Sequence, residues 1–238
     1  VFADRIQQLL SADRQEPPFV GILSNGASGN INNIDFRQKR PPDPPFSKMK
    51  AVANDVAAEA LRVSRSIRYH DWVPLAVRQT EIELGVRRPT AEERDRAGRI
   101  MAHAPGPSLQ TVEEIYARET LMLGEYPSKV PVILQALRIG DLAIAAIPCE
   151  VFVEIGLEIK KKSPFVTTFS TSLANGYNGY LPTPEHHRLG GYETWRARSS
   201  YLEVDASPKI VEQLLELLQQ LKKESPVASR QSPALPRP

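Results

Sequence analysis

The chain has 238 residues, 41% of them hydrophobic and 24% charged, and its formal net charge is +2. These values are typical of a globular protein with one large domain or two small ones, and the charge gives no electrostatic support for a nucleic-acid partner. A single cysteine excludes an internal disulfide. No apolar run approaches the roughly 20 residues that a membrane-spanning helix needs.

The N-terminal part of the chain predicts two helices separated by a loop-rich stretch. Residues 1–10 favour a helix already under way, so we expect that the chain begins inside a domain and that any targeting segment lies upstream. Residues 19–23 are a short apolar run, which predicts a buried strand. The Gly-, Asn- and Ser-rich residues 24–33 predict either a ligand-binding loop at the end of that strand or a plain tight turn. After a proline-rich connector, residues 47–65 have the apolar spacing of a helix.

The next stretch predicts a strand followed by two helices. Residues 72–84 alternate imperfectly between apolar and polar side chains, which favours a strand. Thr90 is a good N-cap for a helix over residues 91–103, and residues 111–123 predict another helix. We interpret the charged faces of both helices as solvated surface.

A β-hairpin and its following helix come next. Residues 130–137 and 142–147 predict the two strands, and Gly140-Asp141 is the turn signal between them. The second strand is apolar throughout, so we expect it to be central in a sheet and covered on both faces. A helix is predicted over residues 150–161, with lysines at its C-terminus.

The C-terminal part predicts one more strand and one more helix. They cover residues 165–173 and 208–223. Residues 224–238 are rich in proline and lack any apolar period, so we predict a disordered tail. The expected architecture is α/β, a mixed β-sheet with helices packed on it, in one incomplete domain over residues 1–223.

Two short segments could carry chemistry. Glu150 stands at the start of a predicted helix, and the Tyr-rich turn of residues 175–180 follows about thirty residues later. A carboxylate and a phenol brought together could bind a metal ion or stabilise an oxyanion. The adjacent His186 and His187 would point opposite ways in an extended segment, which makes them poor joint ligands. Cys149 is either a small buried residue or the reactive thiol of a cysteine hydrolase.

Three stretches resemble the neutral ceramidase family. They are residues 23–33, residues 138–150, and residues 173–185 with their continuation to Gly191-Tyr192-Glu193. The resemblance covers residues 1–223 and identifies them as the C-terminal portion of a catalytic domain. It implies a zinc-dependent amidohydrolase of lipid metabolism, which cleaves an N-acyl amide such as a ceramide, a sphingolipid, with metal-activated water. The implied partner is a lipid-like N-acyl amine. We expect no nucleic-acid partner and no transmembrane segment in this chain.

The resemblance also implies roles for particular residues. Glu150 and Tyr180 resemble two ligands of a Zn²⁺ ion, and the two further histidine ligands are expected upstream of this chain. Tyr192 resembles the tyrosine that donates a hydrogen bond to the oxyanion. Asn32 stands where well-studied members have the serine of a Gly-Asp-x-Ser-Pro-Asn pattern, so the chain resembles a divergent, bacterial-type form in which Asn32 positions the reactants. The family also implies an extracellular or periplasmic parent protein.

Two interpretations of the activity stay open. In the first, the chain is an N-terminally truncated fragment of the hydrolase, which is inactive alone because it lacks half of the ligand set. In the second, the chain is a non-catalytic α/β binding or scaffold module with a degraded site. Truncation would also expose a sheet edge, so we expect self-association of the isolated chain.

Overall fold

The computed structural model describes residues 1–39, 41, 43–104, 106 and 108–224, and the chain forms two compact units. Unit 1 contains Val1–Ser24 and Asn32–Trp72, whereas unit 2 contains Asn25–Ile31 and the chain from Val73 onward. In the part of the chain that the structure describes, no helix is both long enough and apolar enough to cross a membrane.

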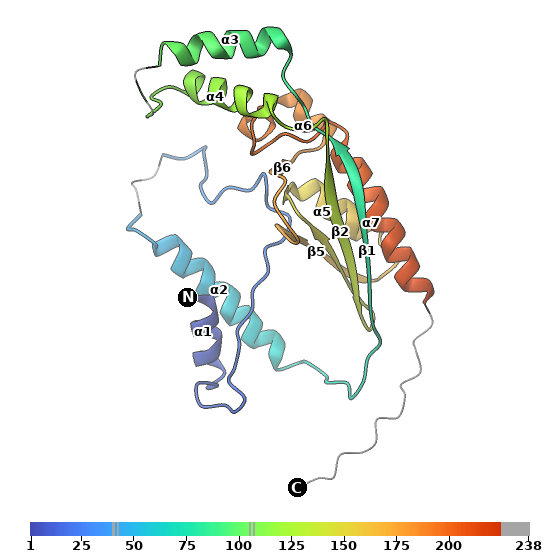
Figure 1. Cartoon of the computed structure of the whole chain (residues 1–238). Helices are drawn as coiled ribbons and strands as arrows, with labels where there is room; N and C mark the ends of the chain where they lie inside the picture. The colour runs from blue at the N-terminus through green and yellow to red at the C-terminus, as the bar shows by residue number, and fades with distance from the viewer. Residues whose placement is uncertain (40, 42, 105, 107, 225–238) are drawn as a thin grey trace. The chain divides into compact units, whose positions relative to one another are not determined.

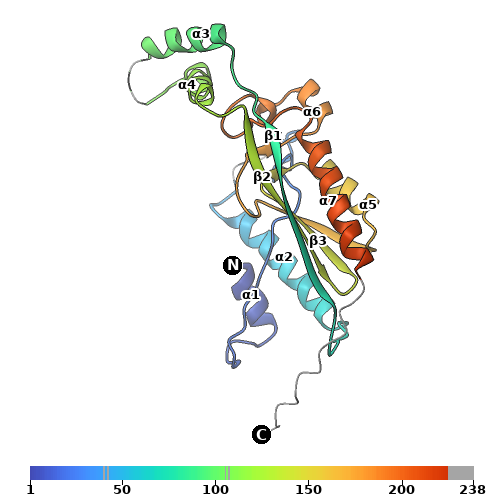
Figure 2. The same cartoon turned by 45° about the vertical axis from the view of Figure 1, so that its right-hand side comes forward.

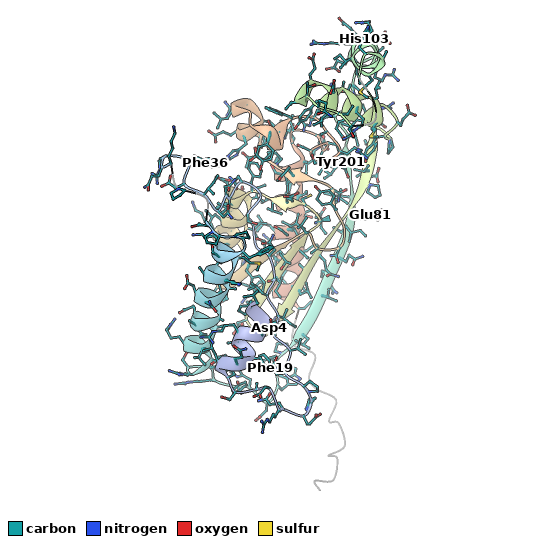
Figure 3. All side chains as sticks on the ribbon, turned by 90° about the vertical axis from the view of Figure 1, so that its left-hand side faces the viewer. Asp4, Phe19, Phe36, Glu81, His103 and Tyr201 are labelled. Atoms are coloured by element: carbon teal, nitrogen blue, oxygen red, sulfur yellow. The ribbon has the colours of Figure 1, made fainter. Side chains whose placement is uncertain are left out.

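Unit 1 is built on two helices, α1 (Phe2–Leu9) and α2 (Ser47–Ser64), which contact each other (Figure 1). Both helices were predicted, and both are confirmed. The buried strand predicted over residues 19–23 is wrong, because this run forms no strand and three of its apolar side chains are exposed. Its Gly21 lies so close to α1 that an added Cβ would be 2.8 Å from the Cα of Ala3. A segment packed on a helix has no neighbouring strand to complete a ladder. Figure 3 labels Asp4 of α1 and Phe19 of this segment.

Unit 2 contains a four-stranded mixed sheet. Its strands are β1 (Leu75–Gly85), β2 (Lys129–Ile139), β3 (Leu142–Ile147) and β5 (Thr167–Ser172), in the order β1-β2-β3-β5. β2 pairs antiparallel with β1 and β3, and β3 pairs parallel with β5. The predicted hairpin and the central position of its second strand are confirmed, with Gly140 in the turn at a φ of 61°. The α/β class with a mixed sheet is therefore correct.

Two helices, α5 (Val153–Lys162) and α7 (Ala206–Lys223), cover one face of this sheet (Figures 1 and 2). Leu134 of β2 is fully buried, as are Leu214 and Leu218 of α7. Alternate residues of β2 enter this core because side chains alternate between the two faces of a strand. The apolar residues of α7 recur every three or four positions, which places them on one side of the helix.

A helical hairpin of α3 (Ala91–Ala102) and α4 (Val112–Gly124) connects β1 to β2. Both helices begin with a capping box, as Thr90 and Thr111 each accept a hydrogen bond from the backbone N–H three residues later. A glutamate at that third position reaches back to the N–H of the cap, so two free donors are satisfied at each helix start. The predicted Thr90 cap is confirmed.

Four short elements lie outside the four-stranded sheet, and three of them carry residues of the candidate site. They are β4 (Glu150–Val151), β6 (Tyr180–Leu181), α6 (Pro184–Leu189) and a 3₁₀ helix η1 (Tyr192–Thr194). Two predictions need correction here. Glu150 belongs to a strand, and α5 begins three residues later at Val153, because the N–H of Glu150 is held in a ladder with Gly179. His186 and His187 lie in a helix that begins with Pro184, and so they are not in an extended segment.

The predicted C-terminal tail falls almost wholly outside the described residues. Residues 225–238 are not among them. Glu224 is described, and its carbonyl oxygen accepts a hydrogen bond of 3.1 Å from Nη1 of Arg138 on β2. The tail therefore stays a prediction from Ser225 onward.

Candidate functional site

The candidate site is centred on the pairing of β4 with β6. These strands run parallel, and Glu150 is the register partner of Tyr180. The N–H of Glu150 donates to the carbonyl of Gly179 at 2.9 Å, and the N–H of Phe152 donates to that of Leu181 at 3.3 Å. Register partners on adjacent strands point to the same face of a sheet, so the carboxyl and the phenol lie side by side. The structure thus brings together two of the residues that the sequence singled out.

Two tyrosines, Tyr177 and Tyr180, interact with the carboxylate of Glu150, and a third, Tyr192, contacts Tyr180. The hydroxyl of Tyr177 donates to Oε1 of Glu150 at 3.1 Å. Burial raises the pKa of Tyr180, and hydrogen bonds with Tyr192 and Glu150 raise it further. The rings of Tyr180 and Tyr192 meet edge to face, with their centroids 5.9 Å apart. At neutral pH the phenol of Tyr180 is therefore protonated.

The Tyr-rich turn is held against the end of β3 by backbone hydrogen bonds. The N–H of Asn178 donates to the carbonyl of Pro148 at 2.7 Å, and its side-chain oxygen accepts from the hydroxyl of Tyr201 at 2.6 Å. Gly179 has a φ of 76°, and an added Cβ would lie 2.4 Å from the carbonyl oxygen of Ser199. Glycine tolerates both the left-handed backbone and this close approach, which explains the Asn-Gly pattern of the turn.

Residues 25–31, which belong to unit 2, contact the same strand. The N–H of Gly29 donates to the carbonyl of Val151 at 2.7 Å, and an added Cβ at Gly29 would lie 2.4 Å from the carbonyl oxygen of Glu150. The side chain of Asn30 accepts from the N–H of Val153 at 2.9 Å and donates to Glu154 at 2.9 Å. Asn30 therefore satisfies a free N–H at the start of α5.

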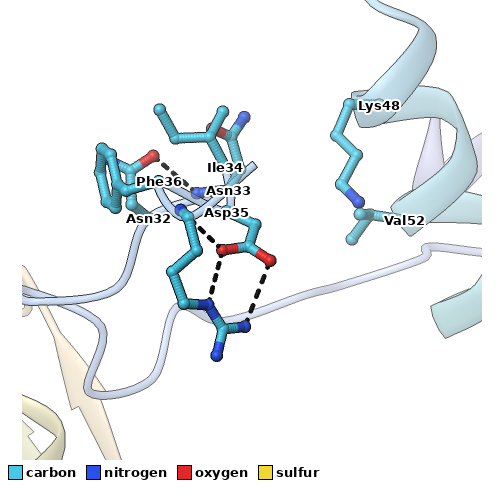
Figure 4. A pocket seen from close by; sticks show the side chains of 8 residues that line it. Asn32, Asn33, Ile34, Asp35, Phe36, Lys48 and Val52 are labelled. Atoms are coloured by element: carbon cyan, nitrogen blue, oxygen red, sulfur yellow. Dashed lines mark hydrogen bonds and ion pairs between the residues drawn. The ribbon is translucent and has the colours of Figure 1, made fainter. Parts of the chain in front are cut away.

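Asn32, which the sequence analysis singled out, belongs to unit 1. Its Oδ1 accepts from the N–H of Asn33 at 2.8 Å. It lines a cavity of about 610 Å³ with residues of the same unit, among them Phe36 and Lys48 (Figure 4). The catalytic role of Asn32 remains a prediction.

The structure places His186 and His103 in hydrogen bonds and His187 in a partly buried position. The Nδ1 of His186 lies 2.7 Å from the hydroxyl of Thr183, and its Nε2 lies 3.9 Å from Glu154. Burial, together with the charge of Arg87, lowers the pKa of His187 to about 4. His103 caps the C-terminus of α3 through a contact of 2.7 Å between its Nδ1 and the carbonyl of Arg99. Among the residues that the structure describes, no three or more His, Cys, Asp or Glu side chains are grouped so that they could hold a metal ion.

Cys149 is fully buried, and burial raises the pKa of its thiol. A protonated, inaccessible thiol is a poor nucleophile, so this environment favours the interpretation of Cys149 as a small buried residue over that of a cysteine hydrolase.

Sequence reasoning missed Tyr177, whose hydroxyl contacts the carboxylate of Glu150. Its place three residues before Tyr180, in the same turn, was the available signal.

Comparison with known proteins yields a likeness of fold alone. No family model matches the chain, and no curated protein matches it. The structure is similar to that of the neutral ceramidase from Pseudomonas aeruginosa, with a TM-score of 0.55, 16% identity, and coverage of 99% of this chain and 42% of that one. It is also similar to a ceramidase complexed with C2, with a TM-score of 0.59, 15% identity, and coverage of 99% and 44%. This chain therefore spans less than half the length of these ceramidases and has the fold of that part of them.

Proposed function

We propose that this chain carries part of the active site of a ceramidase-like hydrolase, which cleaves an N-acyl amide into a carboxylic acid and an amine. One observation carries the proposal. On a fold that is similar to part of two ceramidases, Glu150 and Tyr180 are register partners and Tyr192 contacts the second of them. A carboxylate with adjoining phenols can bind a cation and donate hydrogen bonds to an oxyanion.

The donor atoms present match half of a zinc site. Zinc in catalytic sites takes three protein ligands or more, and carboxylate oxygen is one of its usual ligands. The Glu150 carboxylate suits this role as it stands, whereas the raised pKa of Tyr180 means that its phenol would bind only after the cation displaces the proton. We propose Glu150 and Tyr180 as ligands, with two histidines from outside this chain. When bound, zinc would supply a Lewis acid that polarises an amide carbonyl and acidifies water.

The other residues of the site would position Glu150 and the reactants and stabilise the oxyanion. Tyr177 fixes one oxygen of Glu150 through its hydroxyl, as the outer partners of metal-binding carboxylates do. Tyr192 is the donor that we assign to the oxyanion, since it lies against Tyr180 and is half exposed. Asn32, in place of a serine, offers no alkoxide, so we propose that it positions the reactants and that the attacking group is water.

The test is the paired loss of metal and activity in the full-length protein that contains this chain. Glu150→Gln and Tyr180→Phe should each remove bound zinc, measured by elemental analysis, together with hydrolysis of an N-acyl amide. Glu158→Gln is the matched control, because Glu158 lies on the surface of α5 and pairs with Lys162. Unchanged turnover in Glu150→Gln would end the assignment of this chain to a metal-dependent amide hydrolase.

We expect the isolated chain to bind zinc weakly and to have negligible amidase activity, because two oxygen ligands are too few for a stable site. Tight binding of one zinc ion per isolated chain would contradict the proposal that this chain supplies only half of the ligands. We also propose an extracellular or periplasmic parent protein, on the strength of the family resemblance.

A non-catalytic binding or scaffold module remains the second candidate. The observation that favours it is Asn32, which stands where the family that the chain resembles has a serine and which offers no alkoxide nucleophile. A His-x-His segment and a second His-Pro element in the reading frame upstream of Val1 would favour the enzyme, and their absence would favour the module.

A further inference from the structure

A cavity of about 320 Å³ lies beside the candidate site in unit 2. Ile115 and Tyr116 of α4, together with Tyr177 and Ala197, form the aliphatic and aromatic parts of its wall. Tyr177 is also the residue whose hydroxyl donates to Glu150 at 3.1 Å. One side chain therefore belongs both to the cavity and to the carboxylate cluster.

The lining of this cavity is suited to an uncharged, apolar group. Its two ionic side chains, Glu119 and Arg198, neutralise each other, because Nε and Nη2 of Arg198 both donate to the carboxylate at 2.8 Å. The backbone N–H of Arg198 donates to the same carboxylate at 3.1 Å. A charged ligand would have to displace these bonds, whereas an aliphatic group would contact the aliphatic and aromatic walls. Pockets for small molecules have this character, and their volumes begin at about 300 Å³.

We propose that this cavity is the subsite for the aliphatic chain next to the scissile amide, with Tyr177 as the wall that it shares with the reacting centre. The proposal rests on the proposed function, because it places the amide at Glu150. A chain attached to that amide would enter the cavity past the ring of Tyr177. The cavity is small, so it would select the length and branching of the first part of the chain.

Tryptophan fluorescence of the 238-residue chain gives a readout that does not depend on turnover. Trp195 meets the ring of Tyr116 edge to face at 5.2 Å, so it reports on the cavity wall. The chain has two tryptophans, and Trp72→Phe removes the one in unit 1. In that background, N-octanoylethanolamine should give a saturable change, and N-acetylethanolamine should bind at least about tenfold more weakly, since each buried methylene contributes about 0.8 kcal/mol.

Two variants on the same helix separate the cavity from the surface. Ile115→Gln should weaken binding of N-octanoylethanolamine about tenfold, because it removes apolar contact from the wall. Val112→Gln should leave binding unchanged, because Val112 is exposed on α4 and lines no part of this cavity. Circular dichroism of both variants verifies that they are folded. Equal binding by the two variants, or equal binding of the two amides, would overturn the proposal.

Competition identifies which side of the amide the cavity receives. Displacement of N-octanoylethanolamine by octanoate supports the acyl side, and displacement by octylamine supports the amine side. Displacement by neither overturns the subsite.

Activity of the full-length protein separates the subsite from the function. Ile115→Gln should lower kcat/KM for the octanoyl amide more than for the acetyl amide. An equal loss on both amides would overturn the subsite and leave the hydrolase standing. Hydrolysis that survives Glu150→Gln would refute the proposed role of Glu150 in the hydrolase, whereas the fluorescence result on the cavity does not depend on that role.

Discussion

The ion pair between Glu119 and Arg198 should hold the segment that carries Arg198 and Ser199 onto α4. The carboxylate of Glu119 is nearly buried, with its side chain 10% exposed, and it accepts three hydrogen bonds from Arg198. The carbonyl of Ser199, in the same segment, accepts from the N–H of Tyr180 at 2.8 Å. We therefore expect Glu119→Gln to destabilise the fold and to loosen the strand that carries Tyr180.

The magnitude follows from the burial of the two partners. Removal of one partner from a fully buried pair costs about 3–5 kcal/mol. The Arg198 side chain is 44% exposed, so water solvates part of the cation that remains. We expect a loss of about 2 kcal/mol in the free energy of unfolding, which lowers Tm by roughly 4–8 °C in a domain of this size.

The stabilisation of the fold by Glu119 should decrease as the pH falls. The hydrogen bonds from Arg198 lower the pKa of Glu119 below its value in the unfolded chain. The unfolded state therefore binds more protons as the solution becomes acidic. The stabilisation by Glu119 is complete above the unfolded pKa, near 4.5, and is lost as the pH falls through the lowered pKa of the folded state. The difference between wild type and Glu119→Gln should shrink over that range.

Thermal unfolding and hydrogen exchange check this prediction. Glu113→Gln is the matched control, because Glu113 lies on the same helix in an exposed pair with Arg96. It should change the free energy of unfolding by less than about 0.5 kcal/mol. The amide of Tyr180 should exchange faster in Glu119→Gln than in wild type. A Tm change in Glu119→Gln no larger than that in Glu113→Gln would refute the reasoning.

Three further predictions concern the rest of unit 2. Gly29→Ala should destabilise the fold by about 1–3 kcal/mol, because its Cβ would meet the Glu150 carbonyl. The control Gly98→Ala should be neutral or stabilising, because Gly98 faces open space in α3. Equal Tm shifts in the two variants, or a lower Tm for Gly98→Ala than for Gly29→Ala, would contradict this. Between pH 6.5 and about 4 the wild-type free energy of unfolding should fall by about 1 kcal/mol, because the His187 ring stays neutral in the folded state and protonates in the unfolded state. His187→Asn should make this fall smaller. An unchanged slope of stability against pH would contradict the prediction. The isolated chain should self-associate through an outer strand of its sheet, and Val77→Lys on β1 should reduce this in light scattering; monodisperse wild-type monomers would disprove it.

The order of helices and strands in unit 2 follows from local physical chemistry. Thr90 and Thr111 cap helices because their side chains bond N–H groups only three residues away. The hairpin forms because Gly140 adopts the left-handed turn conformation, and both strands then pair with near neighbours. Such interactions depend on residue types a few positions apart, so periodicity and turn signals were enough to predict them.

The site depends on contacts that no local pattern encodes. Glu150 and Tyr180 are thirty positions apart, and only the parallel pairing of β4 with β6 makes them neighbours. The same pairing placed Glu150 in a strand, although its local sequence favoured a helix start. Residues 19–23 failed as a strand for a related reason, because an apolar run becomes a strand only beside a partner. The cavity at Tyr177 likewise depends on contacts between α4 and a segment far along the chain, among them the ion pair of Glu119 with Arg198.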